Sequence, residues 1–245
     1  QKGKDGALTI SNTSIVNEFT ALVSDANSGD MQLTLTQTTL NDNNRFGSAL
    51  SSGDLILIIQ MQGASVNASA EPWTGNGIYG LPLSAQWGEI TNYNNCGNYE
   101  FAEVASVNSS SVVTLRCALQ HDYTASGRVQ IVRIPRLTSL IVNDTLTTQQ
   151  WNGTTGGICA IEVDGGITIN ANGVINATGL GFRGGTSALY NNIWGSSDFA
   201  SIDPTHGGMK GEGIAGYTSD YTPMGGQYGR GAAANAGGGS ASHNA

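Results

Sequence analysis

The chain has 245 residues, of which 11% are charged, and its formal net charge is −8 with a pI of about 4.6. No cluster of lysine and arginine provides a positive patch for phosphates, so nucleic-acid binding is disfavoured. No apolar run approaches the roughly 20 residues that a membrane-spanning helix needs. Twenty-three of the 35 glycines lie in residues 151–245, which divides the chain into a glycine-poor and a glycine-rich part.

The pattern of residues 1–137 predicts an antiparallel β domain, which would cap the end of the β-helix predicted after it. Short β-rich runs, separated by turn signals such as Asn27-Ser28-Gly29-Asp30, are typical of a small barrel or sandwich. The run at 54–62 is apolar on both faces and should be the central strand. The other strands are expected at residues 7–10, 15–23, 31–38, 99–107, 111–119 and 128–133.

Two long irregular segments, 63–98 and 182–235, interrupt the β pattern, and both carry aromatic residues among glycines. Loops of this length are often functional. Trp73, Trp87 and Trp194 could stack on sugar rings through apolar contact, or they could plug the ends and flanks of β layers. The second alternative is the more ordinary one.

Residues 156–185 contain three β-branched runs, at 158–163, 167–170 and 174–178, each separated from the next by three residues, with corners at Gly165-Gly166 and Asn172-Gly173. No crossover helix fits between them, so they form either hairpins or one coil of a parallel β-helix. The second reading predicts that Ile161, Val163, Ile167, Ile169 and Ile175 point into a narrow shared core. Residues 138–245 would then be the start of a right-handed parallel β-helix, broken by the irregular insert 182–235 and cut short at residue 245.

Several motifs together resemble the N-terminal region of very large, glycine-rich bacterial surface proteins. The motifs are GDLILIIQMQG (53–63), VQIVRIP (129–135), the coil at 156–185 and GQYGRGAAANAGGGSASHNA (226–245). The family comprises gliding-motility adhesins and related proteins exported by the type IX system. The resemblance implies an extracellular position on the bacterial surface and an adhesive or filamentous role without catalytic residues. Implied partners are the secretion or motility machinery, anchoring proteins and extracellular glycans. Asp144-Thr145-Leu146 also resembles an O-glycosylation sequence of such bacteria, with an ordinary turn as the alternative.

Cysteines and acidic loops suggest further sites. Cys96 and Cys117 flank a predicted strand and could form a disulfide in an oxidising compartment, whereas Cys159 reads as a buried small apolar residue. Asn41-Asp42-Asn43-Asn44 places four oxygen-bearing side chains in one loop. Calcium is the one cofactor that this pattern suggests, with Asp42, Asn43 and Asn44 as ligands, and a polar turn is the alternative.

No catalytic motif is found. A glycosidase needs two carboxyl groups that face each other, and the spacing of the acidic residues fixes no such pair. Asp203 and His206 could place an acid and a base on one loop, but a proline turn with a solvated histidine is the more ordinary explanation. We therefore predict an all-β, non-enzymatic adhesin module, with a carbohydrate-active β-helix enzyme or sugar-binding module as the alternative function.

Overall fold

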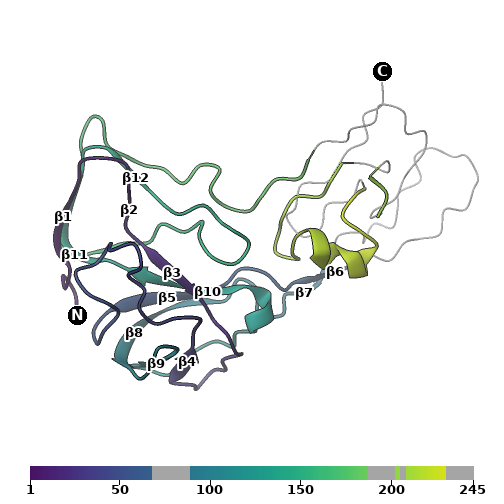
Figure 1. Cartoon of the computed structure of the whole chain (residues 1–245), viewed down its shortest axis with the longest axis horizontal. Coiled ribbons are helices and arrows are strands. Elements are labelled where there is room, and N and C mark those ends of the chain that lie inside the picture. The colour runs from purple at the N-terminus through teal and green to yellow at the C-terminus, as the bar shows by residue number, and fades with distance from the viewer. Residues whose placement is uncertain (68–88, 187–201, 205–207, 230–245) are drawn as a thin grey trace, which may run out of the picture. The chain divides into compact units, whose positions relative to one another are not determined.

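The protein is described by a computed structural model, which covers residues 1–67, 89–186, 202–204 and 208–229 (Figure 1). The chain divides into two compact units. Gln1–Met61 and Gly97–Gly181 form the first, and Gln62–Cys96 and Phe182–Ala245 form the second. The two predicted irregular segments, 63–98 and 182–235, fall largely in the second unit, and the predicted domain boundary after residue 137 stays a prediction.

A curled, antiparallel six-stranded sheet forms one part of the first unit (Figure 1). Its strands, in spatial order, are β3 (Glu18–Ala21), β10 (Val129–Ile134), β5 (Leu55–Gln60), β8 (Tyr99–Val107), β9 (Val112–Leu115) and β4 (Gln32–Thr34). A bridge between Leu22 and Leu35 joins the continuations of the two edge strands, so the sheet curls back on itself. The predicted central position of 54–62 is confirmed, since β5 pairs on both sides. The prediction of one antiparallel domain is wrong for the start of the chain, because residues 6–10 and 14–15 pair in parallel with strands that follow residue 135.

Alternation along the strands builds the core of this sheet. Ile56 and Ile58 of β5 are fully buried inside the curl, where they share a cluster with Val104, Leu115 and Ile131. The residues between them face outward, and Leu57 belongs to a second apolar cluster on the outer face. Burial of both faces explains why this strand reads as a continuous apolar run.

A buried ion pair crosses the curled sheet. The Arg133 guanidinium on β10 donates to the Asp54 carboxylate at 2.9 Å, and both side chains are almost inaccessible to water. Arg133 also donates to the carbonyl of Ser48 at 2.9 Å and stacks over the Phe46 ring, 3.9 Å from its centre. Lys4 provides a second cation for Asp54 at 2.5 Å. Removing one partner would leave a buried charge uncompensated.

The other part of the first unit is a stack of parallel β coils. Coil 1 comprises β1 (Gly6–Ile10) and β2 (Ser14–Ile15), and coil 2 comprises β11 (Arg136–Val142) and β12 (Thr145–Thr147). Coil 3 comprises β13 (Glu162–Val163), β14 (Ile167–Ile169) and β15 (Val174–Ile175). Each strand of coil 2 pairs in parallel with its counterparts in coils 1 and 3. This pairing is the pattern of a parallel β-helix and not of hairpins.

Glycine and asparagine form the corners between the strands of coil 3. A Cβ atom on Gly173 would lie 2.1 Å from the carbonyl oxygen of Val142, so only glycine lets coil 3 approach coil 2 this closely. At the same corner, the Asn170 amide donates to the Asn143 side-chain oxygen at 2.6 Å. The Asn-Gly corner predicted from the sequence is thus explained by coil-on-coil contact.

The interior of the stack is only partly closed. Leu137, Leu140, Val142 and Leu146 of coil 2 are buried, and Ile161 and Val163 of coil 3 pack against them as predicted. The prediction was wrong for the rest of coil 3. The exposed fractions there are 56% for Ile167, 53% for Ile169 and 46% for Ile175. The physical reason is that no described residue forms a coil beyond coil 3.

The second unit contains little regular structure among its described residues. It includes β6 (Ser65–Val66), which pairs antiparallel with β7 (Ile90–Asn92), and the 3-10 helix η3 (Thr218–Met224). One more 3-10 turn, η1 (Ala125–Gly127), lies in the first unit. In the described ranges, no helix is both long enough and apolar enough to cross a lipid bilayer.

Candidate functional site: an aromatic strip on strand β8

Two exposed aromatic side chains lie on the outer face of the curled sheet. Alternation along β8 turns Val104 into the core, whereas Tyr99 and Phe101 point outward and are 57% and 58% exposed. Their rings meet edge to face, with centroids 6.4 Å apart and planes at 87°. Large aromatic rings usually bury most of their surface, so a pair held open to solvent indicates a contact surface.

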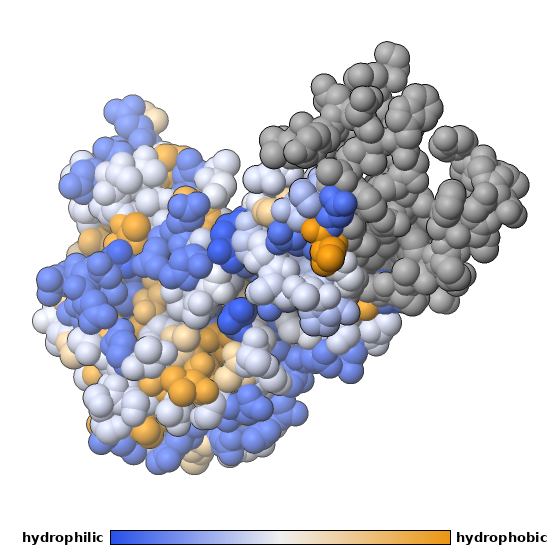
Figure 2. All heavy atoms as spheres, turned by 45° about the vertical axis from the view of Figure 1, so that its right-hand side comes forward, coloured by the Kyte–Doolittle hydropathy of each residue, from blue (hydrophilic) through white to orange (hydrophobic). Residues whose placement is uncertain are grey.

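We call this exposed pair, Tyr99 and Phe101, the aromatic strip. On the neighbouring strand β5, Leu57 is buried and Ile59 is half-buried. Phe101 pairs with Leu57, and Tyr99 pairs with Ile59. Leu57 and Ile59 belong to an outer apolar cluster whose far side packs against Ile158. One side of the outer face is therefore covered from within the chain, while the β8 side is open. Figure 2 shows small patches of hydrophobic residues among hydrophilic ones on the face that it draws.

Charged groups border the aromatic strip at Glu103, two residues after Phe101. The Glu103 carboxylate accepts from Arg136 at 2.7 Å and from Arg116 at 2.8 Å. The pKa of Glu103 is lowered to about 2, first by the hydrogen bond from Arg136 and then by that from the amino group of Gln1. The charge of Arg116 makes a smaller contribution in the same direction. The carboxylate thus stays ionised at neutral pH and has no proton to give as a general acid.

Arg136 holds this border in place. It lies on β11, where its guanidinium also donates to Glu162 of coil 3 and to the carbonyl of Gly53 at 3.0 Å. The hydrogen bond to Glu162 raises the pKa of Arg136 above its ordinary value. Arg116, in contrast, is 58% exposed on its side chain and remains accessible. The border therefore combines one fixed carboxylate with one accessible guanidinium.

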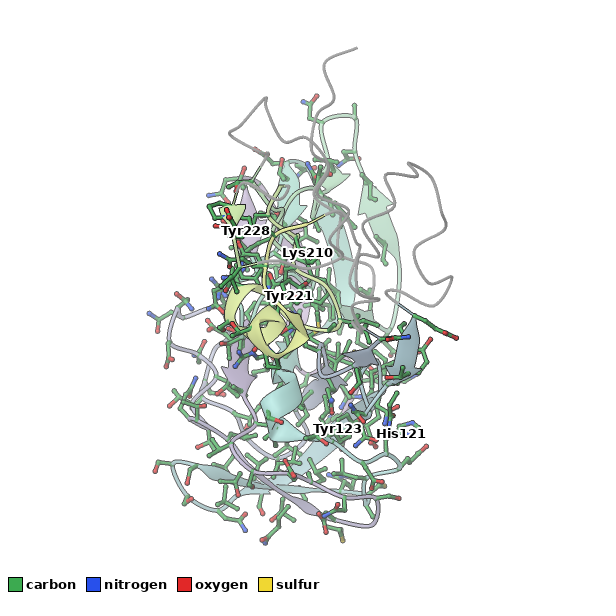
Figure 3. The ribbon with its side chains drawn as sticks, turned by 90° about the vertical axis from the view of Figure 1, so that its right-hand side faces the viewer. His121, Tyr123, Lys210, Tyr221 and Tyr228 are labelled. Atoms are coloured by element: carbon green, nitrogen blue, oxygen red, sulfur yellow. The ribbon has the colours of Figure 1, made fainter. Side chains whose placement is uncertain are left out.

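A second carboxylate on β8 has a local structural role. Glu100 accepts from the backbone N–H groups of Gln120 and His121 and from the Tyr123 hydroxyl at 3.1 Å. Burial, and to a smaller extent Glu100, raise the pKa of Tyr123 well above its usual range. These contacts fix the segment after β9, where Figure 3 labels His121 and Tyr123.

The second unit holds its own buried polar cluster. Glu212 is buried, and its carboxylate accepts from Arg183 at 2.8 and 3.0 Å and from the Gln62 amide at 3.0 Å. The Arg183 guanidinium also lies over the Tyr217 ring at 4.1 Å. The backbone N–H of Arg183 donates to the same carboxylate at 3.0 Å, so the buried charge is well satisfied, which is typical of a structural anchor.

Lys210 lies near this cluster, and Figure 3 shows it close to Tyr221 and Tyr228. Burial lowers the pKa of Lys210 to about 8, since a charged amine is poorly solvated there. The Tyr221 hydroxyl donates to the carbonyls of Gly211 and Gly216 at 2.7 and 2.8 Å. These bonds tie η3 to the preceding loop, so Tyr221 serves to hold the unit together.

The predicted calcium residues close a loop. The Asn41 side chain exchanges hydrogen bonds with the backbone of Phe46, and Asn43 donates to Glu18 at 2.9 Å. Asp42 accepts from Gln37 at 3.2 Å. Throughout the described residues, no group of three or more His, Cys, Asp or Glu side chains could hold a metal ion. The hydrogen bonds close a polar turn, and calcium binding by Asp42, Asn43 and Asn44 stays a prediction.

The remaining predicted residues are distributed over both units. Cys96 is buried, Cys117 is exposed and Cys159 is half-buried, and all three are thiols. The bridge between Cys96 and Cys117 is thus not present in the structure and stays a prediction for oxidising conditions. At Thr145, the backbone N–H donates to the Asp144 carboxylate at 2.6 Å, which forms the corner before β12. Asp203 is exposed. His206 and the tryptophans Trp73, Trp87 and Trp194 lie outside the described residues.

The aromatic strip was missed by sequence reasoning. The run YEFAEV (99–104) alternates Tyr99, Phe101 and Glu103 with Glu100, Ala102 and Val104, so each face carries one glutamate. Polarity alone cannot then tell which face is exposed. The available signal was the spacing of two aromatics by two residues beside a strand that is apolar on both faces.

Comparison with known proteins gives only remote structural likenesses. The sequence matches no protein-family profile and no curated protein. Among the solved structures that resemble it is the tailspike gp61 of Pseudomonas phage phi297, with 16% identity, 65% of this chain and 22% of that chain covered, and a TM-score of 0.27. Another is the gp54 tailspike of Acinetobacter baumannii bacteriophage AP22 in complex with A. baumannii capsular saccharide, with 14% identity, coverages of 67% and 28%, and a TM-score of 0.30. The tailspike gp49 of Pseudomonas phage LKA1 has 16% identity, coverages of 71% and 28%, and a TM-score of 0.27. The chain thus spans less than a third of each, and likeness at this level identifies neither a shared fold nor a shared function.

Proposed function

We propose that this chain is a non-enzymatic β module of an extracellular bacterial surface protein that binds glycans through the aromatic strip. The observation that carries the proposal is the exposure of Tyr99 and Phe101 side by side on a rigid strand. Sugar rings have apolar faces that stack on aromatic side chains, and a strand holds the two rings at a fixed spacing.

The border of the strip supplies the polar half of such a site. The accessible Arg116 guanidinium can donate to sugar hydroxyl or carboxylate oxygens, and Glu103 can accept from hydroxyl groups. An adhesive role fits this arrangement, because the scaffold presents the strip without needing to change shape. The expected role in surface adhesion or gliding motility, and export by the type IX system, belong to the same proposal.

A polysaccharide panel tests the proposal. Purified chain should bind a subset of bacterial capsular or extracellular polysaccharides in titration calorimetry, and the Tyr99→Ala/Phe101→Ala variant should lose at least tenfold in affinity. Val23→Ala is the matched control, because Val23 is an equally exposed apolar residue outside the strip. Unchanged circular dichroism shows that both variants fold. Binding that survives the double substitution would refute the strip as the site.

The carbohydrate-active enzyme is the alternative function, and the same panel addresses it. We expect no release of reducing ends and no unsaturated sugars. Turnover that is abolished by Asp203→Asn would contradict the non-enzymatic assignment. It would leave the fold unchanged as a scaffold for a glycan-degrading site.

A further inference from the structure

The open end of the coil stack is a second surface, separate from the aromatic strip. Parallel pairing places side chains of successive coils in columns, since paired residues point to the same side of the sheet. One column runs from Leu8 through Leu140 to Ile167, and the next from Ile10 through Val142 to Ile169. Among the residues that the structure describes, both columns end at coil 3, and their last members are the exposed ones.

Position within the column decides the burial. Leu140 and Val142 are 1% and 0% exposed, whereas Ile167 and Ile169, their partners in coil 3, are more than half exposed. The third column repeats the contrast, with Leu146 fully buried and Ile175 exposed. Coil 3 thus presents a row of exposed aliphatic side chains at positions that, in coil 2, are covered by a neighbouring coil.

Nothing in the sequence protects this edge. Natural edge strands usually carry lysine, proline or a bulge that prevents pairing with other chains. Residues 165–178 contain no charged residue and no proline, although the whole chain carries a net charge of −8. Two such edges can therefore meet without like charges opposing each other.

The opposite end of the stack is more fully covered. Coil 1 is also an edge of its sheets, yet Ile10 and the adjoining Val16 are buried there and Leu8 is half-buried. Head-to-tail stacking of copies would need an open coil 1, so it is disfavoured. A surface that is open at one end only pairs naturally with its own copy about a two-fold axis.

From these observations we infer that a second copy of this chain covers coil 3, with the β14 edge of each copy pairing antiparallel to the other. The three-residue strand then has its middle residue, Thr168, at the two-fold axis. Ile167 and Ile169 of one copy lie against those of the other, and the interface extends over Val174 and Ile175. The dimer would present two aromatic strips to one polymeric ligand, but it does not depend on glycan binding.

Sedimentation velocity over a wide concentration range tests the inference. The wild-type chain should be a reversible dimer, and Ile169→Asp should raise the dimer Kd by about a hundredfold or more, because a charge would be buried without a partner. Ile169 is exposed in the single chain, so this variant should fold normally. Ile141→Asp is the matched control, since Ile141 is an exposed isoleucine on the neighbouring strand and should leave the dimer intact.

A cross-link tests the geometry. In a Cys117→Ser background, Thr168→Cys should form a disulfide between copies under mild oxidation, and adding Ile169→Asp should abolish it. A wild-type chain that stays monomeric at all concentrations would overturn the inference, as would a dimer that Ile169→Asp leaves unchanged. A monomer that instead binds a synthetic peptide of residues 162–178 would also overturn it, because the open end would then take a parallel coil.

Discussion

The curled sheet and the coil stack lie in one unit and are both built from short strands, but they complete their cores differently. The sheet closes on itself through the Leu22–Leu35 bridge, so each inward residue finds a partner within the same few strands. The stack grows by addition, so burial of each coil depends on the next one. The same alternation of residues therefore gives a complete core in one region and an exposed apolar row in the other.

The largest effect is expected in the closed region. Asp54→Asn should lower the free energy of unfolding by about 3–5 kcal/mol, because Arg133 would keep its buried charge without a full counter-ion. Chemical denaturation monitored by circular dichroism measures the change. Asp164→Asn is the control in the coil stack, where the ion pair with Lys2 is exposed, and should cost less than about 1 kcal/mol. Similar losses in both variants would remove the distinction between the regions.

Within the stack, two members of one column should differ. Leu140→Ala should cost about 2–5 kcal/mol through the cavity it leaves. Ile167→Ala, at the next position of the same column, should stay within about 0.5 kcal/mol, as surface substitutions usually do. Denaturation is followed at low protein concentration, so that association does not contribute. A large loss for Ile167→Ala there would mean that coil 3 is covered within a single chain.

The smallest effect concerns the ionic contact between the two regions. Glu103 on β8 has a folded-state pKa of about 2, below its ordinary value, because Arg136 of coil 2 donates to it. Its contribution to stability is therefore complete above about pH 4.5 and is lost as the pH falls toward 2. Glu103→Gln should lower the free energy of unfolding at pH 7. It should also reduce the loss of stability that the wild type shows between about pH 4.5 and 2 (the acid limb of the stability curve).

Thermal unfolding between pH 2 and 7 measures this difference. Glu89→Gln is the control, because Glu89 is exposed and the substitution should leave the acid limb as in the wild type. An unchanged acid limb in Glu103→Gln would show that the contact does not couple the sheet to the stack.

The strands were largely predictable from the sequence, because alternation and turn residues are local signals. The strand Tyr99–Val107 has the predicted bounds, and the Asn172-Gly173 corner lies where it was expected. The pairing of coil 1 with coil 2 was not predictable, because more than a hundred residues separate β2 from β11 and no local pattern records a distant partner. The cross-sheet pair of Asp54 and Arg133 was missed for the same reason.

The exposed residues of coil 3 show a second limit of prediction from the sequence. Alternation indicates which side of a strand faces the axis of the coil, and it did so correctly for Ile169. It cannot indicate whether another coil lies on that side, so Ile169 was predicted to be buried and is exposed. The aromatic strip was not predicted, because both faces of β8 carry a glutamate and polarity does not show which face is exposed to solvent.

In the sequence, the strands of the curled sheet lie between coil 1 and coil 2, and this has a consequence for the order of folding. Solenoids usually fold by adding neighbouring repeats along the chain, but here coil 1 ends at Ile15 and its partner strand begins only at Arg136. Closing so long a loop is entropically costly unless other contacts form first. The pairing of Glu18 on β3 with Arg133 on β10 provides them, since it brings the two ends of the inserted segment together. On the ribosome, coil 1 would therefore wait on the order of ten seconds, until the whole sheet has emerged, before it finds the strand on which it stacks.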